Sequence, residues 1–419
     1  MAALERTTAP RWGHISYLIV RYGLIAATGI LFYCAVFRIT ADRQSAAAFS
    51  ISLVLFYWFG WEAHGEVSHS LAVIVLLLWL WLAALNYIDR QSATRALVLG
   101  IVIGLGFLAK WSFFFVALGL GIAFAVEEKS RPIFTNLRSL IIPVAEGVVM
   151  LPTVVWVANL DPAILAANVN AAKVGSPLSR ASHILEQSVL VVLGVFLPWA
   201  VVVVGLFVRF QDKAQKNVST NGLIRIALIG AGLCGGTLIV SLVATTLCNW
   251  SLFGISDFAP HYLQPFCILA ALGIAGLIAA RVDSSAFSQH LSRISLVTAL
   301  TIFVVKLALF YTVPTGSAKT NLIPYKGLAY ELDARGFGQA QFVARSATDA
   351  GNLLMYLPRA RALAPSRRNQ PPPPDPLNAR HCVFIWGGEH YERRSKVTHL
   401  GLPPTRCHTR APLNAHTLT

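Results

Sequence analysis

The chain has 419 residues, of which 55% are hydrophobic and only 13% are charged, and its mean hydropathy is +0.61. Soluble domains are closer to a quarter charged, so this composition excludes an ordinary soluble enzyme and indicates a membrane protein. The formal net charge of +15 does not indicate a nucleic-acid partner, because no basic helix or aromatic–basic sheet motif accompanies it. Many of the basic residues lie instead in short loops between apolar stretches, where topology and anionic membrane lipids account for them.

About ten apolar stretches follow one another between residues 15 and 313, most of them near the length that crosses a hydrocarbon core of roughly 30 Å. The predicted spans are residues 15–37, 46–60, 69–88, 96–109, 111–126, 140–157, 185–208, 226–247, 262–280 and 294–313. The stretches at 46–60 and 96–109 are short for a span, so they could be tilted or partly re-entrant. Five glycines predict small faces where helices pack closely: Gly100, Gly104, Gly106, Gly119 and Gly121.

The loops between these spans alternate in charge. Five are basic, at residues 38–43, 90–95, 129–138, 209–225 and 281–293. Of the Lys and Arg residues, the alternate connections carry only Lys110, Lys173 and Arg180. Because Lys and Arg are retained in the cytoplasm, the first set is predicted inside and the second outside. This topology places residues 1–14 outside although they carry Arg6 and Arg11, which predicts a chain that lacks a first spanning helix.

The character of the chain changes after residue 313. Residues 314–388 are polar and contain no further span, and short strands are expected at 341–344 and 382–386 with a short helix at 349–357. These elements predict a small external α/β domain, followed by a tail at 389–419 with few apolar residues. Cys382 and Cys407 lie in this part, where an external location makes a disulfide chemically possible.

The densest group of polar residues is the first outer loop, Trp61-Glu62-Ala63-His64-Gly65-Glu66-Val67-Ser68-His69. At a membrane surface, Glu62 or Glu66 could accept a proton from a hydroxyl, and His69 could orient a phosphate or a sugar. His64, Glu66 and His69 could also hold a divalent metal, although their spacing matches no standard zinc pattern, and no metal site or other cofactor is assigned. The alternative is a solvated loop at the membrane interface.

Three further positions on the same predicted side could bind a substrate. Lys110, followed by Trp111, stands in a turn with no other charge and could neutralise a phosphate, or it could be a lysine that merely snorkels. Asp257, His261 and Tyr262 offer hydrogen bonds at the start of a span, where aspartate and proline are also ordinary capping residues. A looser group consists of Asn159, Asp161, Lys173 and Arg180.

Charged residues that fall within predicted spans include Arg21, Glu146 and Lys306. Arg21 and Lys306 are close enough to the outer ends of their spans to snorkel, whereas Glu146 is nearer to the middle. An ionisable residue at that depth is a functional candidate by default, and a role in helix packing is equally open.

The chain resembles the multi-spanning GT-C glycosyltransferases that use polyprenyl-phosphate sugars, the protein-O-mannosyltransferase and aminoarabinose-transferase group. The segments that carry the resemblance keep their order along the chain and cover roughly residues 15–386. They are the glycine-rich span from 93–97 to Leu108-Ala109-Lys110-Trp111, where the family has Leu-Thr-Lys; Leu151-Pro152 with Trp156 and Asn159; Pro260-His261-Tyr262-Leu263-Gln264-Pro265, similar to (His/Arg)-(Trp/Tyr)-Leu-x-Pro; Ser68-His69; and residues 350–358 of the external part.

The resemblance implies an inverting transfer of a sugar from a polyprenyl-phosphate donor to a lipid, glycan or protein acceptor at the outer face of a bacterial inner membrane, with the C-terminus outside. It assigns Lys110, with His261, to the departing phosphate and leaves Glu62 or Glu66 to orient the acceptor or a metal. The family also has a first span and an outer loop that holds an acidic base, and no segment before Ile15 corresponds to them. The expected protein is therefore an all-α polytopic GT-C enzyme whose activity is in doubt through N-terminal truncation. The alternative is a transporter or flippase, which requires charged residues deep in paired or broken helices.

Overall fold

The computed structural model describes residues 2–61, 69–110, 112–159, 177–211, 221–247, 262–282, 284–312, 325–336, 338, 341–344, 353, 356–357, 361–363 and 382–385. The chain divides into two compact units. One consists of Val20–Leu160 and Ala172–Leu309, and the other of Met1–Ile19, Asp161–Ala171 and Phe310–Thr419.

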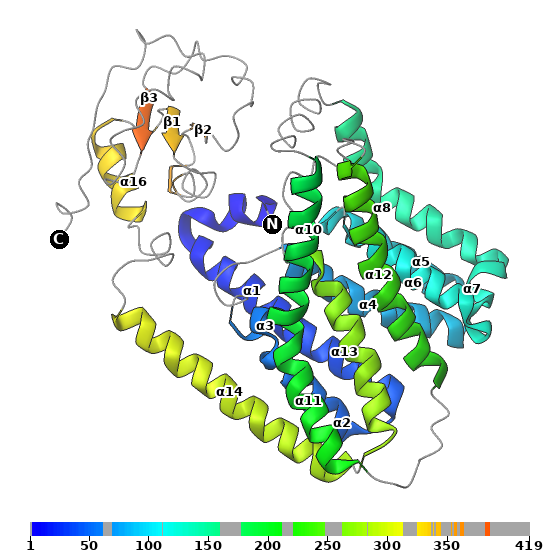
Figure 1. Ribbon diagram of the computed structural model, residues 1–419. Coiled ribbons are helices and arrows are strands. Elements are labelled where there is room, and N and C mark those ends of the chain that lie inside the picture. Colours follow the sequence, from blue (N-terminus) through cyan, green and yellow to red (C-terminus); the bar gives the residue numbers. More distant parts are fainter. Residues whose placement is uncertain are drawn as a thin grey trace. The chain divides into compact units, whose positions relative to one another are not determined.

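The larger unit is a bundle of helices (Figure 1). In chain order the described helices that lie wholly or mainly in this unit are α1 (Ala2–Thr40), α2 (Arg43–Ser52), η1 (Leu53–Leu55), α3 (Tyr57–Gly60), α4 (His69–Asp89), α5 (Ala93–Ala109), α6 (Phe113–Val126), η3 (Glu128–Ser130), α7 (Pro132–Thr135), η4 (Leu137–Leu140), α8 (Ile141–Ala158), α10 (Pro177–Val191), η5 (Val192–Phe196), α11 (Leu197–Phe210), α12 (Asn221–Leu247), α13 (Gln264–Ala279) and α14 (Ser284–Thr312). Within the described residues, six helical stretches are long and apolar enough to cross a membrane, and α5, α6 and α13 are shorter apolar helices. A largely helical membrane protein is thus confirmed, whereas the count of ten spans is not.

The predicted span at residues 46–60 is a broken element. The chain forms α2, one tight turn of η1, and then α3, with Phe56 in an extended conformation between the last two. The ring of Phe56 stacks on Trp199 at 5.3 Å between centroids, and the indole N–H of Trp199 donates to Ser52 Oγ at 2.9 Å. These contacts with Trp199 of α11 stabilise the interruption of the helix. Because α11 is far along the chain, the local hydropathy of residues 46–60 does not reveal the interruption.

The predicted span at 185–208 is longer than expected. It begins at Pro177 in α10, continues through η5, which is a π-helical turn, and ends with α11. Pro198 stands at the start of α11 and has no amide N–H to donate to the turn before it. The π-helical turn thus ends two residues before the proline, as a single widened turn inside a longer helix.

Glycines set the closest helix packing. A Cβ on Gly100 or Gly104 of α5 would come within 2.8 Å of Ala145 or Val149 of α8, and one on Gly119 of α6 would come within 2.7 Å of the backbone of α12. Gly106 packs against the ring of Phe113. The prediction of small faces is confirmed at these four positions and wrong at Gly121, whose Cβ would meet no atom within 4 Å.

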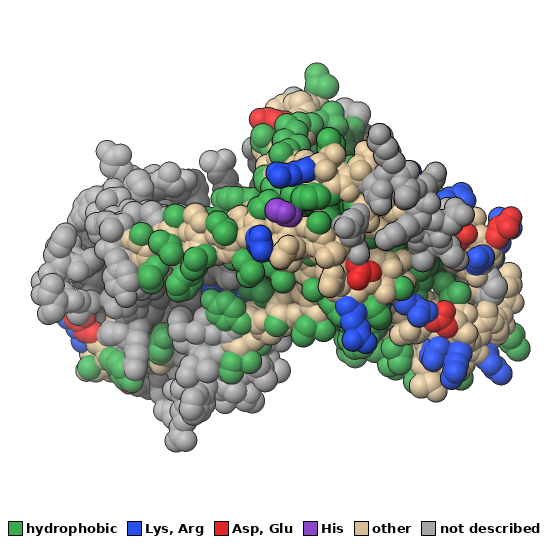
Figure 2. Space-filling model, turned by 90° about the horizontal axis from the view of Figure 1, so that it is seen from below, with side chains coloured by type: hydrophobic (Ala, Val, Ile, Leu, Met, Phe, Trp, Pro, Cys, Tyr) green, Lys and Arg blue, Asp and Glu red, His purple; other side chains and the backbone are tan. Residues whose placement is uncertain are grey.

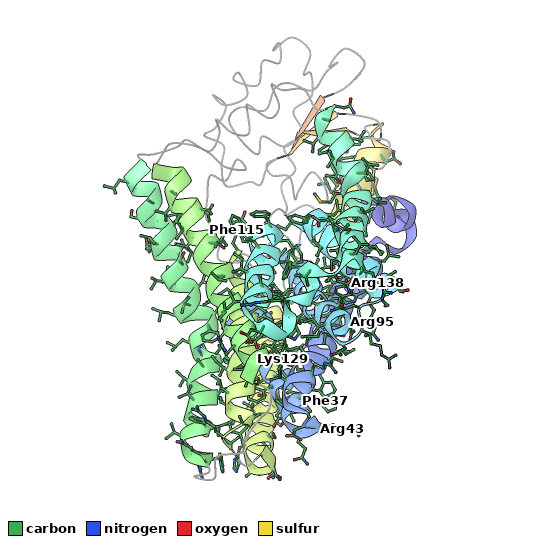
Figure 3. The ribbon with its side chains drawn as sticks, turned by 90° about the vertical axis from the view of Figure 1, so that its right-hand side faces the viewer. Phe37, Arg43, Arg95, Phe115, Lys129 and Arg138 are labelled. Atoms are coloured by element: carbon green, nitrogen blue, oxygen red, sulfur yellow. The ribbon has the colours of Figure 1, made fainter. Side chains whose placement is uncertain are left out.

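The basic loops lie at one end of the bundle, called here the basic end. Contacts link them in pairs: an ion pair between Arg38 and Asp89, a hydrogen bond from Arg138 to the carbonyl of Gln91, an ion pair between Arg225 and Glu127, and an antiparallel bridge between Gln211 and Val282. Figure 2 looks up at the molecule of Figure 1 from below and shows Lys and Arg side chains gathered mainly on one side of the view. In Figure 3, Arg43, Arg95, Lys129 and Arg138 all lie lower than Phe115, which belongs to the first turn of α6.

The smaller unit contains α16 (Tyr325–Ala334) and a three-stranded parallel sheet in the order β2-β1-β3. The strands are β1 (Gln341–Ala344), β2 (Arg361–Leu363) and β3 (Cys382–Ile385), and Gln341 stands opposite both Arg361 and Cys382. The strands expected at 341–344 and 382–386 coincide with β1 and β3, whereas β2, the three residues Arg-Ala-Leu, was not predicted. The helix expected at 349–357 and the tail 389–419 lie mostly or wholly outside the described residues, and Cys407 also lies outside them. The domain boundaries, and residues 314–388 as one external α/β domain, stay predictions.

Candidate active site

Lys110 stands at the tip of a tight hairpin between α5 and α6. Its backbone is extended, its N–H donates to the carbonyl of Gly106 at 3.1 Å, and its carbonyl accepts from Phe113 at 3.0 Å. Because Gly106 has no side chain, the ring of Phe113 packs directly on the last turn of α5. The 17 residues of α5 rise by roughly 25 Å from the basic loop at 90–95. Lys110 therefore lies at the opposite end of the bundle, called here the Lys110 end.

The ammonium group of Lys110 joins three elements that are far apart in the sequence. Its Nζ lies 4.1 Å from the centre of the Tyr262 ring, two residues before α13. It also donates to Ser70 Oγ, in the first turn of α4, at 3.4 Å. The aromatic face attracts the positive charge, and the hydroxyl offers a neutral acceptor. The two contacts hold the cation where the ends of α4, α5 and α13 meet.

Lys110 follows the last residue of α5 and is half-buried. Burial disfavours the charged form and lowers the pKa of the Lys110 ammonium from 10.5 to about 8. The group is thus largely protonated at neutral pH but is poorly hydrated. An anion that binds beside the ammonium would offset the free-energy cost of its desolvation.

Gln264 adds a buried acceptor to the Lys110 end. It is the first residue of α13, and only 3% of it is exposed. Its Oε1 has no hydrogen-bond partner among the described residues. A buried carbonyl oxygen without a partner costs about 1–3 kcal/mol, and a ligand O–H or N–H that reached it would remove that cost.

A second lysine, Lys306, contacts an aromatic ring, that of Trp61. Trp61 is the residue after α3 and the last one before the acidic loop. Lys306 of α14 donates from Nζ to the carbonyl of Trp61, and Nζ lies 4.9 Å from the centre of the indole ring. Lys306 thus contacts Trp61, the residue before the segment 62–68, and Lys110 contacts Ser70, two residues after that segment.

The structure brings together only some of the predicted site residues. Lys110 and Tyr262 are in contact, and His69 begins α4 beside Ser70. Asn159 directly follows α8, and its Nδ2 donates to the carbonyl of Val155 at 2.7 Å, so its hydrogen bonds in the described part cap that helix. Glu62, Glu66, Trp111, Asp257 and His261 lie outside the described residues, as do Asp161 and Lys173. Their roles therefore stay predictions.

A metal site is not found in the part of the chain that the structure describes, where no three His, Cys, Asp or Glu residues are placed to hold an ion. His64 and Glu66 fall outside that part, so the possible divalent metal in the first outer loop stays a hypothesis. Glu146 is half-buried on α8, the helix that packs on α5.

Sequence reasoning missed Ser70, Gln264 and the role of Lys306. Gln264 stands inside the motif that contains His261 and Tyr262, so its position was a usable signal. Lys306 was interpreted as a snorkelling residue, and no local pattern indicates its contact with Trp61, 245 residues away.

The comparisons with known proteins gave one informative match. No protein-family model matches the chain. No solved structure matches it either. The chain is 23% identical over 390 residues to the lipopolysaccharide core galacturonosyltransferase RgtA of Rhizobium johnstonii, an alignment that covers 90% of this chain and 74% of that protein. Together with the apolar helices, this similarity supports a membrane protein whose general activity is glycosyl transfer.

Proposed function

We propose that this protein transfers a sugar from a polyprenyl-phosphate donor to a hydroxyl or amine on a lipid, glycan or protein acceptor at the outer face of a bacterial inner membrane. The observation that carries the proposal is the half-buried Lys110 ammonium, held by Tyr262 and Ser70 at the end of the bundle opposite the basic loops. The distant similarity to a membrane galacturonosyltransferase supports the same class of reaction.

Lys110 would act on the leaving group. In the transfer, the bond between the anomeric carbon and the phosphate oxygen breaks, and the lipid phosphate departs with the electron pair. An ammonium that is already positioned and partly desolvated stabilises that growing negative charge without reorganisation of solvent. Tyr262 offers an aromatic face that favours the protonated form of Lys110.

A carboxylate would activate the acceptor. The acceptor hydroxyl loses its proton to the carboxylate as its oxygen forms the new bond to the anomeric carbon, which inverts that centre. Glu62 and Glu66 are the candidates in this chain, since they belong to the loop bounded by Trp61 and His69. Gln264 Oε1 would accept a hydrogen bond from the sugar or the acceptor.

Only the relative's name suggests which sugar is transferred and which acceptor receives it. A galacturonosyl group is the first donor sugar to test, and the lipopolysaccharide core is the first acceptor. Lys110, whose ammonium is half-buried, and Gln264, whose Oε1 is buried, fit a ligand that carries a phosphate and hydroxyl groups.

The test is transfer of label from a panel of polyprenyl-phosphate sugars to membrane acceptors, with membranes that express the full chain. Lys110→Ala should lower the rate by about 10²–10³-fold, the usual cost of removing one group that stabilises charge in a transition state. The matched control is Lys129→Ala, which removes an exposed lysine at the basic end and should leave the rate unchanged.

Two outcomes would count against the proposal. Unchanged transfer in Lys110→Ala would remove Lys110 from the site. Absence of transfer with every donor, together with movement of an intact lipid-linked sugar across the membrane, would favour a transporter instead.

A further inference from the structure

Two arginines at the basic end, Arg95 and Arg138, are held by neutral groups of the short connection between α4 and α5. Arg95 donates from Nη1 to the carbonyl of Asn86, and Arg138 donates from Nη1 to the carbonyl of Gln91, each at 2.5 Å. In the part of the chain that the structure describes, no carboxylate pairs with either guanidinium, whereas two other arginines at this end have acidic partners. The positions of Arg95 and Arg138 are therefore fixed while their positive charge is not compensated.

Helix packing brings these two arginines side by side. Gly100 of α5 packs on Ala145 of α8. One turn further along both helices, Gly104 packs on Val149, so α5 and α8 run in the same direction. The same register places the start of α5, with Arg95, beside η4, which contains Arg138. Both arginines lie on the right-hand side of Figure 3.

The turn η4 is tied to the α4–α5 connection by two more hydrogen bonds. Asn136 donates from Nδ2 to Gln91 Oε1, and the hydroxyl of the fully buried Tyr87 lies 2.9 Å from Ser139 Oγ. These contacts stand on either side of Arg138 in the chain. A ligand that binds to a frame fixed in this way loses little free energy in ordering the protein.

Both arginines also stand at the start of a helix, where a positive charge is unfavourable. The amide N–H of Arg95 donates to Ser92 Oγ at 3.3 Å in the first turn of α5, and that of Arg138 donates to Asn136 Oδ1 at 2.9 Å in η4, which leads directly into α8. The N-terminal end of a helix carries a partial positive charge, and neither α5, η4 nor α8 has an acidic residue in its first turn. An anion at this place would compensate the guanidiniums and the helix ends together.

An exposed apolar strip begins beside the arginine pair. Leu137 is the neighbour of Arg138 and is 81% exposed, and Leu140, Val144 and Val148 are between 62% and 66% exposed. The last three residues are four apart and so share one face of the helix. Because the helical stretch from 137 to 158 is long and apolar enough to cross a membrane, this face is suited to contact with hydrocarbon chains. The ligand that fits both features has a negatively charged head and apolar tails.

We propose that Arg95 and Arg138 form a binding site for an anionic phospholipid in the membrane leaflet at the basic end. Since Nη1 of each guanidinium binds a carbonyl, the Nε and Nη2 edge is left to donate two parallel hydrogen bonds to the lipid phosphate. The acyl chains would lie along Leu140, Val144 and Val148. Basic pockets between membrane helices bind anionic head groups in the same way. This binding does not depend on sugar transfer at the Lys110 end.

The test measures the melting temperature of the full chain in detergent with three additives: phosphatidylglycerol, phosphatidylcholine with the same acyl chains, and inorganic phosphate. A ligand that binds only the folded state raises this temperature. Phosphatidylglycerol should raise it by about 3 °C or more, and the other two additives should leave it nearly unchanged. In the double variant Arg95→Gln with Arg138→Gln, most of the shift should be lost. Native mass spectrometry of the purified proteins should show one fewer phosphatidylglycerol retained by this variant.

The matched control is the double variant Arg43→Gln with Lys129→Gln, which removes two exposed charges at the same end and should keep the full shift (Figure 3). Equal shifts in the two double variants would show a general attraction to positive charge and would overturn the site. An equal shift with inorganic phosphate or with phosphatidylcholine would overturn the anionic lipid as its occupant. If the arginine double variant does not fold, Arg138→Gln alone, which changes an exposed side chain, should lose part of the shift. An unchanged shift in that single variant would overturn the proposal.

Discussion

At the scale of single residues, Lys110 combines two properties that work against each other. Burial lowers the pKa of its ammonium to about 8, while the Tyr262 ring at 4.1 Å favours the charged form. The residue is therefore charged but poorly solvated at neutral pH, which suits its proposed role of neutralising a phosphate. The sequence identified Lys110 as a lone charge in a turn, but its partners lie 40 and 152 residues away and no local pattern connects them.

The pKa of Lys110 predicts how transfer should depend on pH. The free protein loses the positive charge as pH rises through about 8, so kcat/KM should fall above that pH. A bound phosphate stabilises the ammonium, so the corresponding fall in kcat should occur at higher pH. In Lys110→Arg the side chain remains charged throughout, and the fall near pH 8 should disappear. The measurement is kcat/KM from about pH 6 to 10 in both proteins. An identical alkaline limb in the arginine variant would assign the titration to another group.

The ring of Tyr262 should matter more than its hydroxyl. A cation–π contact contributes about 0.5–2 kcal/mol, so Tyr262→Leu should lower kcat/KM by roughly 2- to 30-fold. Tyr262→Phe keeps the aromatic face and should lose less. The comparison is made from the initial rates of transfer with the same donor. Equal losses in the two variants would show that the hydroxyl, and not the ring, supports the reaction.

At the scale of helices, close packing depends on glycines that hydropathy alone does not distinguish. Gly100 and Gly104 allow α5 to lie against α8, and Gly119 allows α6 to lie against α12. Their spacing on one helix face predicted small faces correctly in these cases. Gly121 is only two residues from Gly119 and so lies on another side of α6, where its Cβ would meet no atom within 4 Å.

The α5–α8 packing can be tested by adding a single methyl group. Gly100→Ala would bring Cβ into the carbonyl of Ile142 and within 2.8 Å of the Cβ of Ala145, so the helices must separate at a cost of about 1–3 kcal/mol. The melting temperature in detergent, followed by tryptophan fluorescence, should fall. Gly147→Ala on α8 is the matched control, because its Cβ would meet nothing within 4 Å. A melting temperature that is the same in both variants would contradict this packing.

Helix boundaries show where hydropathy stops being informative. The apolar run predicted a span from 294, whereas α14 begins at Ser284. Polar residues at helix ends carry no hydropathy signal, and capping hydrogen bonds define the start instead, as when Asp42 accepts from the amides of Gln44 and Ser45 before α2. The break inside residues 46–60 was missed for another reason, since contacts of Phe56 and Ser52 with Trp199 maintain it.

At the scale of the whole bundle, charge separates two ends. The predicted basic loops contact one another at the basic end, and the Lys110 end carries the candidate site. The positive-inside rule then predicts that the basic end faces the cytoplasm. Alkaline phosphatase joined after Lys110 should be active, because it would be exported, and the same enzyme joined after Ser92 should be inactive. Activity in the reverse pattern would place the candidate site on the cytoplasmic side and would contradict the proposed transfer at the outer face.

The sequence by itself determined that this is a largely helical membrane protein, since long apolar runs have one stable form in lipid, and it located most helices and the segregation of basic loops. It also indicated glycosyl transfer through a set of ordered motifs. Only the tertiary structure decided that α2, η1 and α3 form a broken element, that Lys110 meets Tyr262 and Ser70, and that Lys306 holds Trp61. The physical reason is that hydropathy and charge act locally along the chain, whereas these contacts join residues between 40 and 245 positions apart.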